Sequence, residues 1–426
     1  MSRKAPRRLI DDCFLTDKER LTHEEALDIL RERLSPVADL EPVPLAEATG
    51  RVAADAVLAP RPVPAADNAA VDGYAFALAD YEATGGFFPV AGRVPAGHPT
   101  SEKLPIGAAA RIFTGAVMPP RADTVAMQED CEPHEQDGQD FVIIPPGLKQ
   151  GANRRRAGED LAQGTALFDA GQILRSQDVA AAASVGTAAI TCYEPLKVAI
   201  VSTGDEVLEP GSTFRDGAVY DANRPLLQGL LAGLPVEVTD LGILPDRRDE
   251  VQETLRAAAE THHAILTTGG ASRGEEDHIV STLDEIGSRH MWQLAIKPGR
   301  PMTFGQLGDC VFLGLPGNPV AAFVCFRLYV RPALLRLAGA DWAEPRRVML
   351  KAEFDIRSKP DRREFLRGIL LTENGTVTGV DKFDRDGSGL ITGLREADGL
   401  IEIPEATTEV KEGDEVAFLS WGELGG

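Results

Sequence analysis

Four polar, glycine-rich segments in the middle of the chain have residue types that suit the binding of an anion. They are residues 202–206, 268–277, 297–301 and 315–319. Glycine lets the backbone approach a ligand closely, and the free N–H groups at a following helix start attract negative charge. Each segment alone could be only a tight turn. Their common position beside apolar runs favours a binding site.

The charged residues of these segments have both signs. Lys297 and Arg300 suit phosphate or another oxyanion, but carboxylates lie in the same segments, at Asp205, Glu206, Glu275, Glu276 and Asp277. Carboxylates and phosphate repel each other unless a hard cation lies between them. The sequence therefore predicts Mg²⁺, with Asp205, Glu206 and Asp277 as its ligands. The alternative is that these acids only stabilise helix N-termini.

Apolar runs and helical patterns alternate around the four segments. Strand-like runs occur at 198–201, 236–241, 264–267 and 310–313, and helical patterns at 225–231, 249–261 and 277–286. This alternation predicts a doubly wound parallel sheet with helices on both faces. In such a sheet, ligands bind beyond the carboxyl ends of the strands, which is where the polar segments fall.

The flanking regions have a different character. Thr22 and Glu25 form a capping-box pattern that predicts a helix from about residue 22, and residues 176–184 form an alanine-rich helical pattern. Residues 46–153 contain short apolar runs separated by Gly and Pro, which predicts small antiparallel strands. Short strands also return after residue 341, which predicts a small β unit at the C-terminal end.

Composition excludes several classes of protein. The 426 residues carry 44 Lys and Arg against 66 Asp and Glu, a net charge of −22, which disfavours nucleic-acid binding. No apolar run reaches the ~18 residues of a membrane-spanning helix. The five cysteines are far apart and contain no Cys-x-x-Cys pair, which predicts a reducing, cytoplasmic location. The seven histidines form no metal-binding pattern.

The motifs, taken together and in order, resemble the molybdopterin molybdenumtransferase family of molybdenum-cofactor synthesis, which is related to the C-terminal domain of gephyrin. The resemblance covers nearly the whole chain. It is carried by residues 67–75, 111–115, 128–129, 155–160, 202–206, 221–225, 268–272, 297–301 and 314–319.

The resemblance implies a subunit of four domains that forms a homodimer. The implied domains are a discontinuous helical domain of residues 1–45 and 154–194, a β-rich domain of 46–153, an α/β molybdopterin-binding domain of 195–338 and a C-terminal β-barrel of 339–426. The site would lie between the α/β domain of one subunit and the β-rich domain of the other. The implied enzyme takes adenylylated molybdopterin and molybdate, inserts molybdenum and releases AMP with the assistance of Mg²⁺.

The resemblance also assigns site residues. The implied catalytic positions are Asp72, Thr114, Asp160, Glu206, Asp246, Asp277 and Lys297. The implied ligand-binding positions are Gly269, Gly270, Ser272, Arg300, Pro316, Pro319, Arg367 and Ser388. Three positions depart from the family pattern: Gln293 and Arg300 stand where lysine is frequent, and Val71 stands where methionine is usual.

Two other functions stay open from the sequence. One is a non-catalytic molybdopterin-binding scaffold of the gephyrin type, which the intact acidic set disfavours. The other is a molybdopterin adenylyltransferase, which shares the α/β domain but usually lacks the flanking β-rich regions. The molybdenumtransferase function that the resemblance implies has two kinds of partner. An adenylyltransferase acts before it in the synthesis, and maturation proteins of molybdoenzymes act after it.

Overall fold

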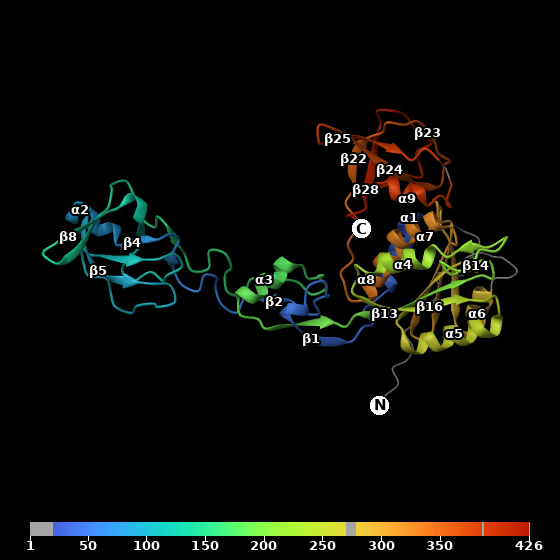
Figure 1. Ribbon diagram of the computed structural model, residues 1–426, viewed down its shortest axis with the longest axis horizontal. Coiled ribbons are helices and arrows are strands. Elements are labelled where there is room, and N and C mark those ends of the chain that lie inside the picture. Colours follow the sequence, from blue (N-terminus) through green and yellow to red (C-terminus); the bar gives the residue numbers. More distant parts are fainter. Residues whose placement is uncertain (1–19, 270–277, 386, 426) are drawn as a thin grey trace. The chain divides into compact units, whose positions relative to one another are not determined.

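The computed structural model describes residues 20–269, 278–385 and 387–425, and the chain divides into two compact units (Figure 1). Unit 1 comprises Met1–Asp55, Ala170–Leu174 and Thr191–Gly426, and unit 2 comprises Ala56–Asp169 and Arg175–Ile190. The finer division into four domains stays a prediction. Among the described helices, none has the length and apolar character needed to cross a lipid bilayer.

A six-stranded sheet lies at the centre of unit 1, in the order β16-β13-β17-β21-β20-β18. Its strands are β13 (Leu196–Thr203), β16 (Val236–Leu244), β17 (Ala264–Thr268), β18 (Ser288–Gln293), β20 (Pro301–Leu307) and β21 (Cys310–Leu315). The predicted parallel pairing holds from β16 to β21. Strands β20 and β18 instead run antiparallel to their neighbours. The turn at Gly308 and Asp309 joins β20 to β21 and is too short for the crossover that a parallel pair needs.

Helices cover both faces of this sheet, which confirms the predicted α/β architecture (Figure 1). The helices are α4 (Asn223–Leu231), α5 (Arg248–Thr261), α6 (His278–Ile286), α7 (Pro319–Cys325) and α8 (Arg331–Leu337), with a π-helical turn at Phe326–Val330. Ala199 and Val201 of β13 pack with α5 and α6, whereas Val198 and Ile200 pack with α4 and α7. Successive strand residues point to opposite faces, so an apolar run on β13 fills both cores.

A second six-stranded sheet forms the C-terminal part of unit 1, in the order β19-β24-β26-β28-β22, with β25 paired to β24. Its strands are β19 (Ile296–Lys297), β22 (Val348–Lys351), β24 (Arg363–Glu373), β25 (Thr376–Lys382), β26 (Gly399–Ile403) and β28 (Glu415–Ser420). Smaller elements here are β23 (Ile356–Arg357), β27 (Glu409–Val410) and α9 (Thr392–Glu396). Lys297, predicted in a loop of the central sheet, lies on β19 opposite Glu364 of β24.

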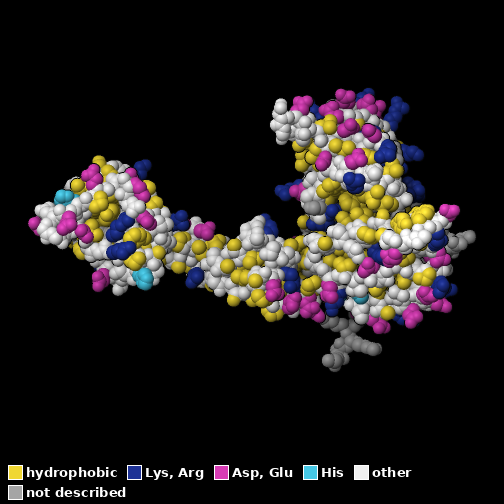
Figure 2. All heavy atoms as spheres, viewed as in Figure 1, with side chains coloured by type: hydrophobic (Ala, Val, Ile, Leu, Met, Phe, Trp, Pro, Cys, Tyr) yellow, Lys and Arg dark blue, Asp and Glu magenta, His cyan; other side chains and the backbone are white. Residues whose placement is uncertain are grey.

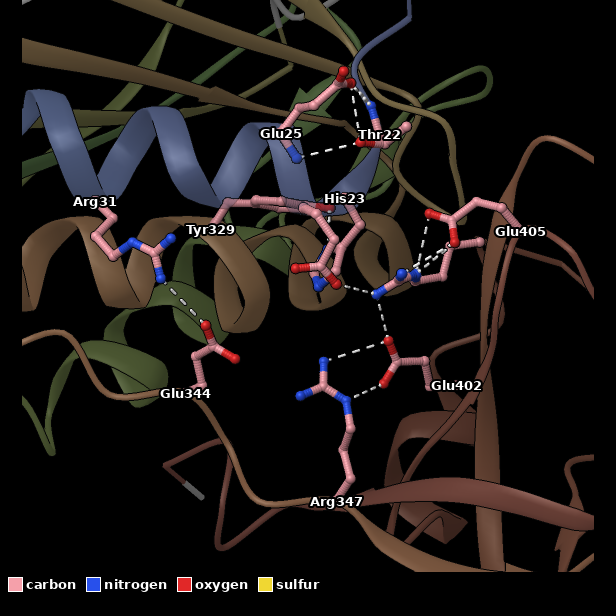
Figure 3. Close-up of polar contacts among 11 residues, drawn as sticks. Thr22, His23, Glu25, Arg31, Tyr329, Glu344, Arg347, Glu402 and Glu405 are labelled. Atoms are coloured by element: carbon pink, nitrogen blue, oxygen red, sulfur yellow. Dashed lines mark hydrogen bonds and ion pairs between the residues drawn. The ribbon is translucent and has the colours of Figure 1, made fainter.

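The N-terminal helix α1 (His23–Arg33) begins at the predicted capping box (Figure 3). The Glu25 backbone N–H donates to Thr22 Oγ1 at 3.2 Å, and the Thr22 N–H donates to Glu25 Oε2 at 2.8 Å. His23 is buried, and its Nδ1 lies 2.8 Å from the hydroxyl of Tyr329 in the π-helical turn. The sequence start signal is therefore confirmed, and it places a histidine in the core.

Arg363 connects α1 to the C-terminal sheet. Its guanidinium lies 2.8 Å from Glu24 of α1 and 2.7 Å from Glu402 of β26. Arg347 also donates to Glu402, at 2.6 Å. The side chains of Arg363 and Glu402 are almost fully buried, and removal of one partner from a buried ion pair typically costs about 3–5 kcal/mol. The network therefore fixes β24 against the N-terminal helix.

Unit 2 is built around a six-stranded sheet in the order β7-β4-β6-β5-β9-β8. Its strands are β4 (Gly73–Phe76), β5 (Phe87–Val94), β6 (Ala109–Ile112), β7 (Thr124–Met127), β8 (Glu132–Gln136) and β9 (Gln139–Ile143). The predicted antiparallel pairing holds except between β5 and β6, which are parallel. The predicted alanine-rich helix is confirmed as α3 (Ser176–Ser184).

Short elements complete the two units. In unit 2, β2 (Val57–Leu58) pairs with β11 (Ala166–Phe168), and β3 (Asn68–Ala69) pairs with β10 (Arg154–Arg155). The other short elements are β1 (Leu40–Pro44), β12 (Ala189–Tyr193), β14 (Val207–Leu208), β15 (Val219–Tyr220), α2 (Tyr81–Thr84) and the 3₁₀ turns Leu45–Glu47, Leu78–Asp80 and Gln128–Asp130.

We expect Gly73→Ala to destabilise unit 2 by about 1–3 kcal/mol, because the new Cβ would overpack the sheet. A Cβ at Gly73 would lie 1.8 Å from the carbonyl oxygen of Ala126 on β7. Gly92 of β5 is the matched control, since no heavy atom lies within 4 Å of a Cβ there. The rate of native-state thiol labelling at the buried Cys131, read by peptide mass spectrometry, reports opening of unit 2. Equal rates in the two variants would contradict the prediction.

Candidate active site

A cleft of about 420 Å³ lies at the carboxyl ends of the central parallel strands in unit 1. We call it the strand-end cleft. Of the predicted site residues, it is lined by Glu206 after β13, Gly269 after β17 and Pro319 at the start of α7. The Gly269 N–H donates to the carbonyl oxygen of Leu315 at 3.2 Å, which holds two of the predicted segments together. Three of the four predicted polar segments therefore converge at this edge of the sheet, whereas residues 297–301 line another cleft.

Two carboxylates meet beside this edge, at the ends of β13 and β16. The Asp205 N–H donates to Asp246 Oδ2 at 3.0 Å, and the Asp246 N–H donates to Asp205 Oδ1 at 3.1 Å. Asp205 is exposed and Asp246 is half-buried. Each carboxylate uses one oxygen in this reciprocal pair, and within the described residues its other oxygen has no hydrogen-bond donor. Both aspartates were predicted from the sequence. Their pairing was not, because it joins residues that are far apart in the chain.

Glu206 lies next to the pair and folds back over its own loop. A Cβ placed on Gly204, whose φ is +133°, would lie 2.5 Å from Glu206 Oε2. The loop therefore needs glycine at this position for two reasons, the backbone angle and the close carboxylate. The Glu206 backbone carbonyl accepts from the N–H of Val219, which anchors β15 at the rim of the cleft.

A second cleft, of about 270 Å³, lies between the central sheet and the C-terminal sheet of unit 1. We call it the cationic cleft, because three cations line it: Lys297, Arg367 and Lys382. Pro316 and Ser388, also predicted from the sequence, line the same cleft. Asn318 lines both clefts, so the two adjoin along one loop.

Backbone and aromatic contacts hold Arg367 in this cleft. Its Nη1 donates to the carbonyl oxygen of Leu390 at 3.1 Å and its Nη2 to that of Arg385 at 2.7 Å. The guanidinium carbon lies 4.8 Å from the ring centroid of Phe383. These contacts fix Arg367 to the 385–390 loop that carries Ser388.

A buried carboxylate positions Lys297. Its ammonium lies 3.3 Å from Glu364 Oε2, and the side chain of Glu364 is only 2% exposed whereas that of Lys297 is 43% exposed. Burial alone would raise the pKa of Glu364, but the hydrogen bond from Arg362 and the charge of Lys297 outweigh it and hold that pKa below its usual value. Glu364 is therefore an anion that anchors the lysine at the cleft wall.

Lys382 and Glu364 were not among the predicted site residues, since neither belongs to a segment with a recognisable motif. Arg300, which was predicted, does not line either cleft. Its Nη2 donates to Gln293 Oε1 at 3.2 Å, so two of the three departures from the family pattern contact each other. The predicted residues Gly270, Ser272 and Asp277 lie outside the described residues, as do Glu275 and Glu276.

Unit 2 carries the other predicted site residues. Both the N–H and the hydroxyl of Thr114 donate to Asp72 Oδ1, at 2.8 and 2.7 Å. These hydrogen bonds, with a smaller contribution from the charge of Arg111, hold the pKa of Asp72 below its usual value. Asp160 is exposed, and its N–H donates to the carbonyl oxygen of Val63 at 3.1 Å. Thr114 thus holds the ionised carboxylate of Asp72 in place on an ordered loop.

Comparison with known proteins decides the family. The chain is 35% identical over 406 residues to the molybdopterin molybdenumtransferase of Haemophilus influenzae, and the match covers 95% of this chain and 99% of that protein. The chain belongs to the molybdopterin molybdenumtransferase family. A molybdopterin molybdenumtransferase of a Nostoc species is 31% identical and matches 91% of this chain and 90% of its own length.

Family models and a solved structure agree with this membership in the molybdenumtransferase family. The models described as MoeA N-terminal region (domain I and II), probable molybdopterin binding domain and MoeA C-terminal region (domain IV) match residues 21–186, 199–336 and 349–421. The crystal structure of the molybdopterin biosynthesis MoeA protein from Pyrococcus horikoshii is 30% identical, with a TM-score of 0.78. It matches 95% of this chain and 99% of that one. The family and the multidomain fold predicted from the motifs are confirmed.

In this member of the molybdenumtransferase family, we expect Thr114→Val to raise the pKa of Asp72 towards its ordinary value. The variant removes the hydroxyl donor that lowers this pKa most and keeps the backbone N–H. A ¹³C NMR titration of the aspartate carboxyl groups measures the change. Asp80 is the internal control, because Arg121 and not Thr114 holds its pKa low. An unchanged titration of Asp72 would show that the hydroxyl contact does not persist in solution.

Proposed function

We propose that this protein inserts molybdenum from molybdate into adenylylated molybdopterin and releases AMP, as the last step of molybdenum-cofactor synthesis. The observation that carries the proposal is the contact of the two clefts along Asn318. One cleft is glycine-lined with carboxylates beside it, and the other is lined by cations. This arrangement suits a reaction that brings a nucleotide and a free oxyanion to one place.

The cationic cleft is the proposed molybdate site. Lys297 and Lys382 supply ammonium groups, and Arg367 supplies positive charge from a guanidinium that two backbone carbonyls hold in place. Ser388 supplies a hydroxyl at the same wall. A tetrahedral dianion matches these donors in charge and in the number of its oxygens. The buried Glu364 offsets part of the positive charge and restrains Lys297.

The strand-end cleft is the proposed site of the pterin nucleotide. Gly269 and Gly317 bring bare backbone to its wall, so phosphate groups can approach the main chain. Cleavage of the phosphoanhydride depends mainly on positioning and on neutralisation of the growing charge. Glu206 and the Asp205–Asp246 pair lie where that bond would be held.

The donors at this edge fit Mg²⁺, because Mg²⁺ prefers carboxylate oxygens. Asp205 and Asp246 would hold Mg²⁺ through the carboxylate oxygens that do not take part in their reciprocal hydrogen bonds. Among the described residues no group of three or more His, Cys, Asp or Glu side chains is assembled, so further ligands would come from the substrate or from the predicted Asp277. Bound there, Mg²⁺ supplies positive charge to the pyrophosphate link.

We further propose that the protein acts as a homodimer in the cytoplasm. In this proposal the β-rich part of one subunit, with Asp72 and Thr114, completes the site of the other. An adenylyltransferase would supply the substrate and maturation proteins of molybdoenzymes would receive the product. The family resemblance and the four cysteines of the described residues, which are separated and buried, support this setting.

Incubation of the purified protein with adenylylated molybdopterin, Mg²⁺ and molybdate tests the function. We expect AMP release that requires molybdate and is lost when Mg²⁺ is chelated. Tight binding of the nucleotide with no AMP release would favour the scaffold reading. AMP release at the same rate without molybdate would contradict coupled insertion.

A further inference from the structure

Two arginines lie side by side on neighbouring strands of unit 2. Arg93 of β5 is the register partner of Arg111 of β6. Their guanidinium carbons lie 4.7 and 4.9 Å from the centroid of one ring, that of Phe113. Arg111 also lies 5.1 Å from the ring centroid of Tyr74. The aromatic rings therefore hold both cations at one place on the sheet.

Within the described residues, neither arginine has a carboxylate in ion-pair distance. Arg111 donates to the carbonyl oxygen of Gly73 at 3.0 Å and to the neutral side chain of Gln128. Like charges directly opposite each other on a sheet are destabilising. The protein has a net charge of −22, so carboxylates are abundant, yet this pair is left without one. In Figure 2, Lys and Arg side chains lie among hydrophobic ones on the visible face of unit 2.

The position of the guanidinium groups over the Phe113 ring leaves hydrogen-bond donors for a ligand. A guanidinium that lies over a ring uses its flat face, and its N–H edge stays available. Arg93 is exposed and Phe113 is half-buried, so this edge is open to solvent. The next residue after Phe113 is Thr114, which donates to Asp72. The arginine pair thus adjoins the two predicted catalytic residues of unit 2.

We propose that Arg93 and Arg111 form an oxyanion site that takes a phosphate or pyrophosphate group. The class of ligand follows from the guanidinium donors, which bind phosphate oxygens in pairs. That the phosphate belongs to the adenylylated pterin rests on the proposed function. Arg111 is the fixed member, held by its own hydrogen bonds, and Arg93 is the member that contributes charge to the ligand.

NMR of the full-length protein labelled with ¹⁵N-arginine tests the site without any enzymatic assay. Inorganic pyrophosphate is the probe, and the Nε–H signals of Arg93 and Arg111 are assigned with R93K and R111K. We expect both signals to shift in a saturable way. The signal of Arg121, which is paired with Asp80, is the control and stays in place. Unmoved Arg93 and Arg111 signals, or shifts that sodium chloride reproduces at equal ionic strength, would overturn the proposal.

A second experiment identifies the source of the phosphate. We expect R93Q to raise the KM for adenylylated molybdopterin about tenfold, which is the size of one lost charge-assisted hydrogen bond, with little change in the KM for molybdate. Lys103→Gln, at another exposed cation of unit 2, is the matched control. Saturable NMR shifts with an unchanged KM would assign the site to free phosphate. A failure of the proposed function would abolish turnover in the wild type and leave the NMR result intact.

Discussion

Lys297→Gln should lower the kcat of molybdate-dependent AMP release by about 10²–10³, the effect of removing one preorganised charged contact from a transition state. The Lys297 ammonium faces the cationic cleft, and the buried Glu364 anchors it there. Glutamine keeps a hydrogen-bond donor on a side chain one atom shorter, and it removes the charge. A steady-state assay with varied molybdate measures kcat and KM together.

Two variants make this test specific. Lys411→Gln, at an exposed lysine of the same unit that contacts Glu409, removes the same charge far from either cleft lining and should leave kcat unchanged. Lys382→Gln removes a second cation of the cleft and should raise the KM for molybdate. Wild-type turnover of the Lys297 variant would remove the cationic cleft from the mechanism.

The local signals in the sequence predicted the elements well. The capping box at Thr22 and Glu25 depends on contacts only three residues apart, so the start of α1 could be located without tertiary information. The apolar run of β13 is also a local signal, and it indicated a strand that is buried on both faces. Antiparallel β20 was less predictable, because its direction depends on the two-residue turn that joins it to β21, and β18 then pairs antiparallel with β20.

The sequence predicted which residues belong to the site but not which of them contact each other. Asp205 and Asp246 were each named, yet their reciprocal hydrogen bonds join loops that only the sheet brings together. Lys297 was placed in a loop of the central sheet, whereas pairing with β24 puts it on the C-terminal sheet. Lys382 and Glu364 were not predicted, because no sequence pattern around a lysine or glutamate outside a motif indicates a function. Such residues are defined by the packing of the C-terminal sheet against the central sheet.

The stability of unit 1 should fall as the pH decreases from about 6.5 to 4, because His23 is buried in its neutral form. Burial, helped by the charge of Arg363 and opposed by Glu402 and Glu24, lowers the pKa of His23 to about 4. Below its ordinary pKa of 6.5 the unfolded chain binds a proton that the folded chain takes up only near pH 4. Above pH 6.5 this contribution is constant. The full difference corresponds to about 3 kcal/mol, at 1.36 kcal/mol for each unit of pKa.

Urea unfolding followed by tryptophan fluorescence isolates this contribution, because Trp292, Trp342 and Trp421 all belong to unit 1. Other ionisable groups also change the stability with pH, so the informative quantity is the difference between wild type and His23→Asn. The loss of unfolding free energy between pH 7 and pH 5 should be smaller in this variant by about 2 kcal/mol. His98→Asn, at an exposed histidine, should keep the wild-type dependence. Parallel pH profiles for His23→Asn and wild type would mean that His23 is already protonated in the fold, and that the carboxylates of the Arg363 network outweigh its burial.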